Sequence, residues 1–234
     1  MVDKFTVFWE EKAKNMKAIW KDVLQIAIYN TGLSEQGNLV VVLKNDNIEE
    51  LVKAHKIVQE IRRKNIPAPL IVSPHYIKNS LDSFPLEFLN IKSDYQNLVV
   101  QEDIFKELQF DKKYIRLEME RELKSKELLI KMTVLDNFGR TKTLKELISF
   151  SIKSIEPVLK GLLFLLDQQI PKERKQLIYQ ADEITEFDIS SLLNAVEYTT
   201  GTRNFTKNEL PVFFEKFTRQ LLSLSDYVEK YNNK

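Results

Sequence analysis

The chain has 234 residues, with 35 Lys plus Arg against 34 Asp plus Glu and a formal net charge of +1. This balance gives the whole molecule no field that attracts nucleic acid or an anionic membrane, so any such binding must be local. The chain has no cysteine, which excludes disulfides, thiol nucleophiles and thiolate zinc sites. The length allows one large or two modest domains.

Apolar runs in the sequence are short. No stretch approaches the roughly 20 uncharged apolar residues that span a bilayer, and Met1 to Phe8 lacks the apolar core of a signal peptide. We therefore expect no membrane association and a cytoplasmic location. The richest apolar run, Val158 to Leu166, is about nine residues long and predicts a core helix.

The N-terminal half mixes helix and strand signals. Apolar residues at three- and four-residue spacing predict a helix over residues 3 to about 30, and the aliphatic run Leu39 to Leu43 predicts a buried strand. A helix capped by Asp46 or Asn47 is expected next, running to about residue 64.

Prolines divide the following segment into short elements. Leu70 to Val72 is predicted to be a strand, residues 75–83 a short helix, and Leu86 to Ile91, after Pro85, an extended piece followed by Leu98 to Val100. Strands alternating with helices favour a small sheet with helices packed on it.

Strand signals disappear after about residue 102. Helices are predicted over 112–132, 142–168, 171–182, 188–199 and 207–231, and together they indicate a bundle. The sequence thus predicts an α+β protein, in which a small mixed-sheet domain, residues 1–110, precedes an all-helical bundle domain, residues 111–234.

One stretch carries a family resemblance. It runs from Ser80 to Lys92, is followed by Gln101-Glu102-Asp103, and continues into a helix rich in Arg, Glu and Leu from Arg116 to Lys126. This pattern resembles a bacterial two-domain group of the nucleotidyltransferase superfamily, which includes polymerase beta and the kanamycin nucleotidyltransferases. The resemblance spans roughly residues 20–130, and the C-terminal half fits it by architecture alone.

The resemblance implies a metal site and a phosphate-holding turn. In that superfamily a Gly-Ser turn precedes an Asp-x-Asp pair on an apolar strand, and a third carboxylate completes a site for two divalent cations that bridge the triphosphate. Laid on that pattern, Leu39 to Leu43 puts Gln36 and Asn38 at the two aspartate positions and Glu87 at the third. The glycine turn is reduced to Gly32-Leu33-Ser34, so Gly32 and Ser34 are the candidate cofactor-binding residues.

Two of the three carboxylates of the implied site are thus replaced by amides. An amide oxygen can coordinate Mg²⁺ but does not offset its charge, so we expect no bound metal, no catalytic residue and no cofactor, with Glu87 as a relict ligand. The resemblance then implies a pseudoenzyme that acts as a binding or regulatory protein. It also implies that Asn38 and Glu87 lie on adjacent strands with side chains on one face, and that Gln36 points into the same cleft because strand side chains repeat with period two.

Two alternatives stay open. The first is an active nucleotidyltransferase that uses Mg- or Mn-NTP with relocated carboxylates such as Asp46, Glu49 or Glu87. The second is a protein-interaction module whose helical half pairs with itself or with another bundle. Its surface would be formed by Phe213, Phe214, Phe217, Leu221, Leu222 and Leu224, a set that fits a core stripe better than an exposed surface. The partner is then an unidentified protein or a second copy; a nucleotide or a nucleic acid is a weaker expectation.

Overall fold

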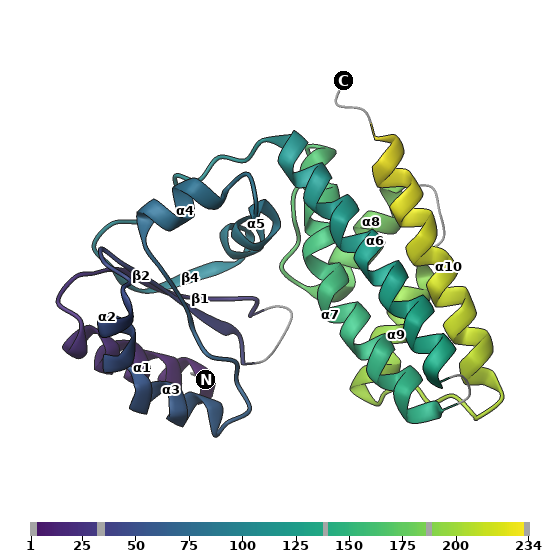
Figure 1. Cartoon of the computed structure of the whole chain (residues 1–234), viewed down its shortest axis with the longest axis horizontal. Coiled ribbons are helices and arrows are strands. Elements are labelled where there is room, and N and C mark those ends of the chain that lie inside the picture. The colour runs from purple at the N-terminus through teal and green to yellow at the C-terminus, as the bar shows by residue number, and fades with distance from the viewer. Residues whose placement is uncertain (1–3, 32–35, 138–139, 186–188, 232–234) are drawn as a thin grey trace. The chain divides into compact units, whose positions relative to one another are not determined.

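The computed structural model describes residues 4–31, 36–137, 140–185 and 189–231. The chain divides into two compact units, Met1–Phe110 and Asp111–Lys234. Within the described residues the first unit holds a small mixed sheet with helices and the second unit is helical, so the fold is α+β, as the sequence predicts (Figure 1).

The sheet has four strands in the order β3-β2-β1-β4. They are β1 (Val23–Tyr29), β2 (Asn38–Leu43), β3 (Leu70–Val72) and β4 (Tyr95–Val100). β1 is antiparallel to both β2 and β4, whereas β2 and β3 are parallel. All seven residues of β1 are buried, because this strand lies in the middle of the sheet and both faces are covered.

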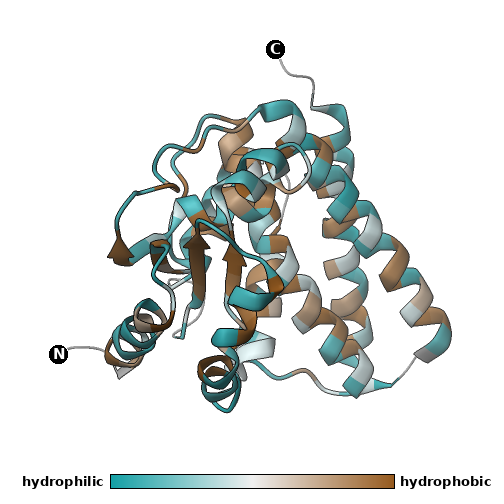
Figure 2. Cartoon of the chain, turned by 60° about the vertical axis from the view of Figure 1, so that its left-hand side comes forward, coloured by the Kyte–Doolittle hydropathy of each residue, from teal (hydrophilic) through white to brown (hydrophobic). Residues whose placement is uncertain are grey.

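Helices cover both faces of the sheet (Figures 1 and 2). α1 (Lys4–Ile19) and α3 (His55–Arg62) pack on one face, where Trp9, Met16 and Ile61 meet Ile26 and Val41. α4 (Pro74–Ser80), α5 (Pro85–Ser93) and the segment around Phe105 pack on the other face. We call this second surface the α5 face of the sheet; its strand residues include Ala27, Tyr29, Val40 and Val42.

The prediction of one helix from residue 3 to about 30 is wrong beyond residue 19. α1 ends at Ile19, and Val23–Tyr29 form the central strand. A strand buried on both faces is apolar at nearly every position, so its residues also satisfy a helical three- and four-residue spacing. The aliphatic and aromatic residues Val23, Ile26, Ile28 and Tyr29 favour the extended form.

The extended piece predicted over Leu86 to Ile91 is also wrong. Pro85 stands in the first turn of α5, where a proline needs no backbone donor and its fixed φ suits the helix. Five of the six residues from Leu86 to Ile91 are buried, and so short a largely apolar segment does not distinguish a strand from a short buried helix.

The segment between β2 and β3 follows the prediction with one break. Asn47 caps α2 (Ile48–Lys53) by accepting a hydrogen bond from the Glu50 amide at 3.0 Å, which confirms the predicted cap. The helical path is interrupted at Ala54, after which α3 continues to Arg62. α4, over Pro74–Ser80, confirms the short helix predicted there.

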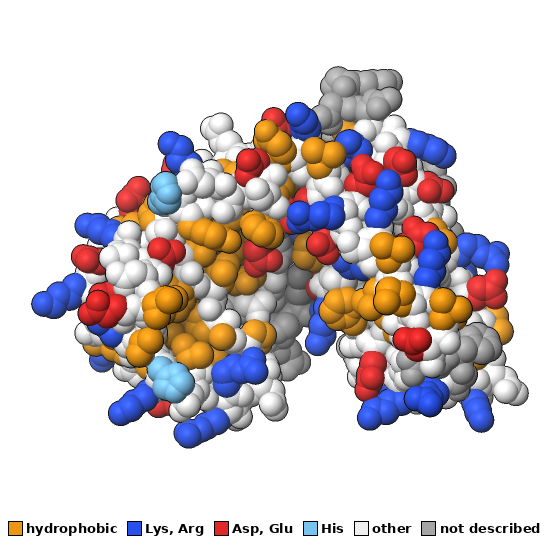
Figure 3. Space-filling model, in the orientation of Figure 1, with side chains coloured by type: hydrophobic (Ala, Val, Ile, Leu, Met, Phe, Trp, Pro, Cys, Tyr) orange, Lys and Arg blue, Asp and Glu red, His pale blue; other side chains and the backbone are white. Residues whose placement is uncertain are grey.

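The second unit contains α6 (Lys112–Asn137), α7 (Thr141–Leu165), α8 (Arg174–Thr185), α9 (Ser190–Thr200) and α10 (Glu209–Lys230). These helices match the five predicted ones, and in the described part of the chain no strand follows β4. α7 contacts each of the other four and is buried on most sides, as expected of a central helix. Lys, Arg, Asp and Glu side chains are interspersed over the visible surface of this unit (Figure 3).

Candidate functional site

Two of the three positions implied by the family resemblance, Asn38 and Glu87, are both connected to Tyr29 near one end of the β1–β2 hairpin. In the register of the sheet, Tyr29 is the partner of Asn38 on β2 and of Tyr95 on β4. Directly opposed residues of antiparallel strands present their side chains on the same face. Tyr29 belongs to the α5 face, so Asn38 opens onto that face as well. We call Tyr29, Thr31, Asn38, Glu87 and Asp94 the hairpin-mouth site.

Glu87 reaches the hairpin-mouth site from a helix. It lies in the first turn of α5, and the Tyr29 hydroxyl donates a hydrogen bond to Glu87 Oε1 at 3.2 Å. The expectation that Asn38 and Glu87 occupy adjacent strands is therefore wrong, because residues 85–93 are helical. Tyr29 links the two, since it pairs with Asn38 across the sheet and with Glu87 through its hydroxyl.

Tyr29 holds its proton firmly. Burial and the neighbouring Glu87 carboxylate both raise the pKa of Tyr29 far above its usual value. The phenol is thus a hydrogen-bond donor throughout the neutral range and does not supply a base. The hydrogen bond from Tyr29 occupies one lone pair of the Glu87 carboxylate, which is then not available to coordinate a metal ion.

A second carboxylate lies at the other end of α5. Asp94 is the C-cap residue of α5, is buried, and precedes β4 directly. The Thr31 hydroxyl donates a long hydrogen bond to Asp94 Oδ2 at 3.4 Å. Sequence reasoning did not single out Tyr29, Thr31 or Asp94. Their signal lay in the pairing of β1 with β4, which a predicted helix over residues 3–30 conceals.

Gln36 is fixed through its backbone. Its carbonyl accepts a hydrogen bond from Trp9 Nε1 of α1 at 2.6 Å, and Gly37 follows with a left-handed φ of 62°. β2 begins only at Asn38, so the period-two argument that put Gln36 and Asn38 in one cleft does not apply. The other candidate turn residues, Gly32 and Ser34, lie outside the described residues.

Two of the three carboxylates named in the active-enzyme alternative, Asp46 and Glu49, lie away from the hairpin mouth. Asp46 and Glu49 follow the far end of β2, whereas Asn38 begins that strand. At about 3.3 Å per residue the six residues of β2 separate them from the hairpin mouth by more than about 15 Å. Among the described residues no group of three or more His, Cys, Asp or Glu side chains is arranged to hold a metal ion.

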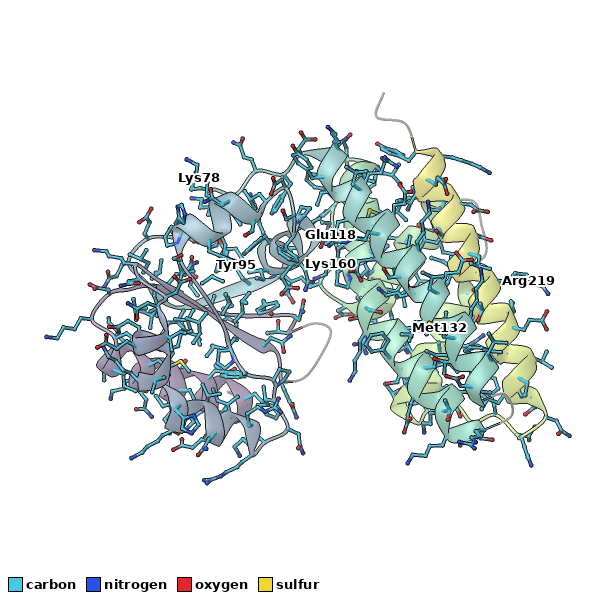
Figure 4. The ribbon with its side chains drawn as sticks, in the orientation of Figure 1. Lys78, Tyr95, Glu118, Met132, Lys160 and Arg219 are labelled. Carbon is cyan, nitrogen blue, oxygen red and sulfur yellow. The ribbon has the colours of Figure 1, made fainter. Side chains whose placement is uncertain are left out.

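A separate polar cluster joins β4 and the loop after it to β1. Gln25 is fully buried in β1, and its Nε2 donates to Asn97 Oδ1 at 2.7 Å and to Asp103 Oδ1 at 2.8 Å. Asp103 also accepts from the Tyr95 hydroxyl at 2.9 Å and from Asn97 Nδ2 at 3.0 Å. Figure 4 labels Tyr95 beside the sheet of the first unit.

Electrostatics fix the protonation states in this cluster. Burial of Asp103 opposes its ionisation, but the hydrogen bonds from Tyr95, Gln25 and Asn97 outweigh that effect and lower the pKa of Asp103. Burial, together with the Asp103 carboxylate, raises the pKa of Tyr95 to about 12. Gln25, Tyr95, Asn97 and Asp103 are all hydrogen-bonded to one another within the cluster. We therefore interpret the cluster as a structural element that holds the loop after β4 against β1, and not as a reactive site.

No protein-family model matches this chain, and a search of curated proteins finds no match either. None of the helices in the described part of the chain combines the length and apolar character that a membrane span requires.

Proposed function

We propose that this chain is a nucleotidyltransferase-like protein that has lost metal-dependent nucleotidyl transfer and acts by binding. The carrying observation is the hydrogen bond from Tyr29 to Glu87 beside Asn38. Where the superfamily concentrates three carboxylates for two dications, this chain presents an amide on β2, a protonated phenol on β1, and the carboxylates of Glu87 and Asp94, each of which accepts a hydrogen bond from a hydroxyl group. An amide and a phenol add no negative charge to offset a metal ion.

Calorimetry with ATP and Mg²⁺ or Mn²⁺ tests the proposal on the full chain. We expect a dissociation constant weaker than about 1 mM, because the mouth lacks the charge that would hold a metal–triphosphate complex. We also expect no transfer of a labelled nucleotide. A micromolar dissociation constant that Glu87→Gln weakens would show that the site still binds the metal–nucleotide complex, and would contradict the proposal.

The interaction-module alternative needs a correction. Its proposed surface on α10 is core, since Phe213, Phe214, Phe217, Leu221 and Leu224 are buried and Leu222 is partly buried. The reading of this stripe as core is therefore confirmed. An interaction through the helical unit has to use a different surface.

A further inference from the structure

The first unit concentrates its positive charge in the helices on one face of its sheet. Residues 4–21 and 48–65, which contain α1, α2 and α3, carry ten Lys and Arg against five Asp and Glu. Residues 74–110, which contain α4 and α5 on the other face, carry three Lys and Arg against six Asp and Glu. The net charge of +1 for the whole chain therefore conceals a separation of charge within this unit.

α1 and α3 lie side by side and run antiparallel. Lys12 of α1 pairs with Glu60 of α3 at 2.6 Å. One turn earlier on α1, the Phe8 ring meets the Lys64 ammonium just after α3, at 5.4 Å from the ring centre. The contacts thus move down one helix as they move up the other, and the outer sides of the two helices form one continuous surface.

This surface carries exposed cations that have no acidic partner. Lys56 and Arg63 stand seven residues apart and so share one line along the exposed side of α3. Lys14 is two residues from the buried Met16 and points away from the core. Figure 3 shows Lys and Arg side chains along the margin of the first unit where Figure 1 places α1 and α3. We call the exposed cations that form no ion pair with any described residue of the chain the basic surface: Lys14, Lys17, Lys21, Lys56, Arg62 and Arg63.

Most carboxylates among these helices are already engaged. Glu11 and Glu60 both bind Lys12, at 2.9 and 2.6 Å. Glu50 binds Lys53 at 2.5 Å. Among the described residues, the carboxylates of this layer that form no ion pair are Glu10 and Glu49. The unpaired cations therefore outnumber the unpaired carboxylates, and the surface offers positive charge to an outside partner.

We propose that the basic surface binds the phosphate backbone of a nucleic acid without reading its base sequence. Cations that are free in the protein neutralise phosphates and release the counterions that surround them, which is the main source of sequence-independent binding. Arg62 and Arg63 present planar guanidinium groups that suit phosphate geometry, and the exposed amides of Asn15 and Asn65 lie among the cations. The basic surface lies on the face of the sheet opposite the α5 face, so the inference does not rest on the loss of the metal site.

The same surface lacks the aromatic anchors of a helix that lies on a membrane. Such helices insert Trp, Phe and Leu side chains beside their Lys and Arg residues. Here Trp9 and Trp20 are buried in the core, and the Phe8 ring lies against the ammonium groups of Lys12 and Lys64. The exposed large apolar side chains of this layer are aliphatic: Val7, Ile48 and Val52. These features favour nucleic acid over an anionic membrane.

Fluorescence anisotropy of labelled single-stranded oligonucleotides, measured with the full chain over a salt series, is the test. The parent binds oligonucleotides of unrelated sequence with similar micromolar dissociation constants at low salt, and binding weakens steeply as salt rises. Lys56→Gln together with Arg63→Gln weakens binding more than about tenfold and reduces the steepness of the log–log salt dependence by roughly 1 to 2, because two phosphate contacts are lost.

The matched control is Lys78→Gln together with Lys106→Gln, which removes the same charge from two exposed lysines elsewhere in the same unit. Figure 4 labels Lys78 on α4. This control keeps the affinity and the salt dependence of the parent, and both double variants unfold in urea as the parent does because all four side chains are exposed. Equal weakening by the two double variants, or a parent that binds no oligonucleotide at about 100 µM in low salt, overturns the proposal. Binding to vesicles that contain phosphatidylserine without binding to oligonucleotides also overturns it, since the surface then recognises a membrane.

Discussion

Gly37 is the residue whose backbone most directly shapes the hairpin mouth. It has a φ of 62°, and a Cβ added there would lie 3.2 Å from the Tyr29 carbonyl oxygen and 3.3 Å from Thr31 Cγ2. Gly201 also has a positive φ, of 83°, but an added Cβ meets nothing within 4 Å. The two glycines therefore share the left-handed conformation and differ in crowding.

We predict that Gly37→Ala lowers the free energy of unfolding by about 2–3 kcal/mol, and Gly201→Ala by about 1 kcal/mol. The larger decrease expected for Gly37→Ala arises because the new Cβ must displace the backbone of Tyr29 and the side chain of Thr31. Urea denaturation of both variants against the parent provides the comparison. Equal decreases in the free energy of unfolding for the two variants would mean that Tyr29 and Thr31 move aside without cost, and that the close packing around Gly37 does not stabilise the hairpin-mouth site.

Individual side chains of the candidate site were only partly predictable. The family resemblance implied that Asn38 and Glu87 belong to one site, and in the structure each is a neighbour of Tyr29, Asn38 by register and Glu87 by a hydrogen bond. The link itself was missed, because Tyr29 lay inside a predicted helix. The side chain of Gln36 was expected to point the same way as that of Asn38, because strand side chains alternate with period two. That expectation fails because Gly37 is left-handed and β2 begins only at Asn38.

At the scale of elements, Asp103 connects the loop after β4 to the buried Gln25 of β1. The pKa of Asp103 is lowered in the folded protein, so its ionised form stabilises the fold. That contribution is fully present above the unfolded carboxyl pKa of about 3.9 and is lost as the pH falls through the lower folded value.

We predict that Asp103→Asn costs about 1–2 kcal/mol at neutral pH, since the amide places a donor where Gln25, Asn97 and Tyr95 already donate. The difference from the parent is constant above about pH 5 and shrinks below about pH 4, where the parent carboxylate protonates. Denaturation at several pH values measures it. Asp22→Asn, at an exposed position in the same unit, is the control. A cost that does not change down to pH 3 would show that the charge of Asp103 contributes nothing.

Element types were predictable where one face is polar and ambiguous where both faces are buried. Most helices of the second unit were expected because apolar residues recur at helical spacing between polar ones, as along α6 and α10. α7 was expected because its apolar run is too long for an ordinary strand. β1 was predicted to be helical and α5 to be extended, because both are short and largely buried, and their apolar residues fit either spacing. Burial on both sides is a property of the assembled sheet, which local sequence does not encode.

At the scale of the whole molecule, the two units present different chemistry. The first unit contains two polar clusters, at the hairpin mouth and around Asp103, whose contacts described above are made within the unit. The second unit exposes apolar side chains along α6, among them Leu128, Met132 and Leu135.

The central claim is that the hairpin mouth is a decayed metal site, and Mn²⁺ binding by a restored variant tests it most directly. Gln36→Asp together with Asn38→Asp restores the two aspartates that the family resemblance implies beside Glu87. Because Gln36 is held through its backbone carbonyl before β2 begins, the test also shows whether a side chain at residue 36 reaches the hairpin mouth. Asn38→Asp alone, and the double change combined with Glu87→Gln, are the matched controls. We predict Mn²⁺ binding with a dissociation constant below about 1 mM in the double variant, and much weaker binding in the parent and in both controls. A double variant that binds Mn²⁺ no better than the parent would contradict the account, because carboxylates restored at these positions would then fail to converge on a metal.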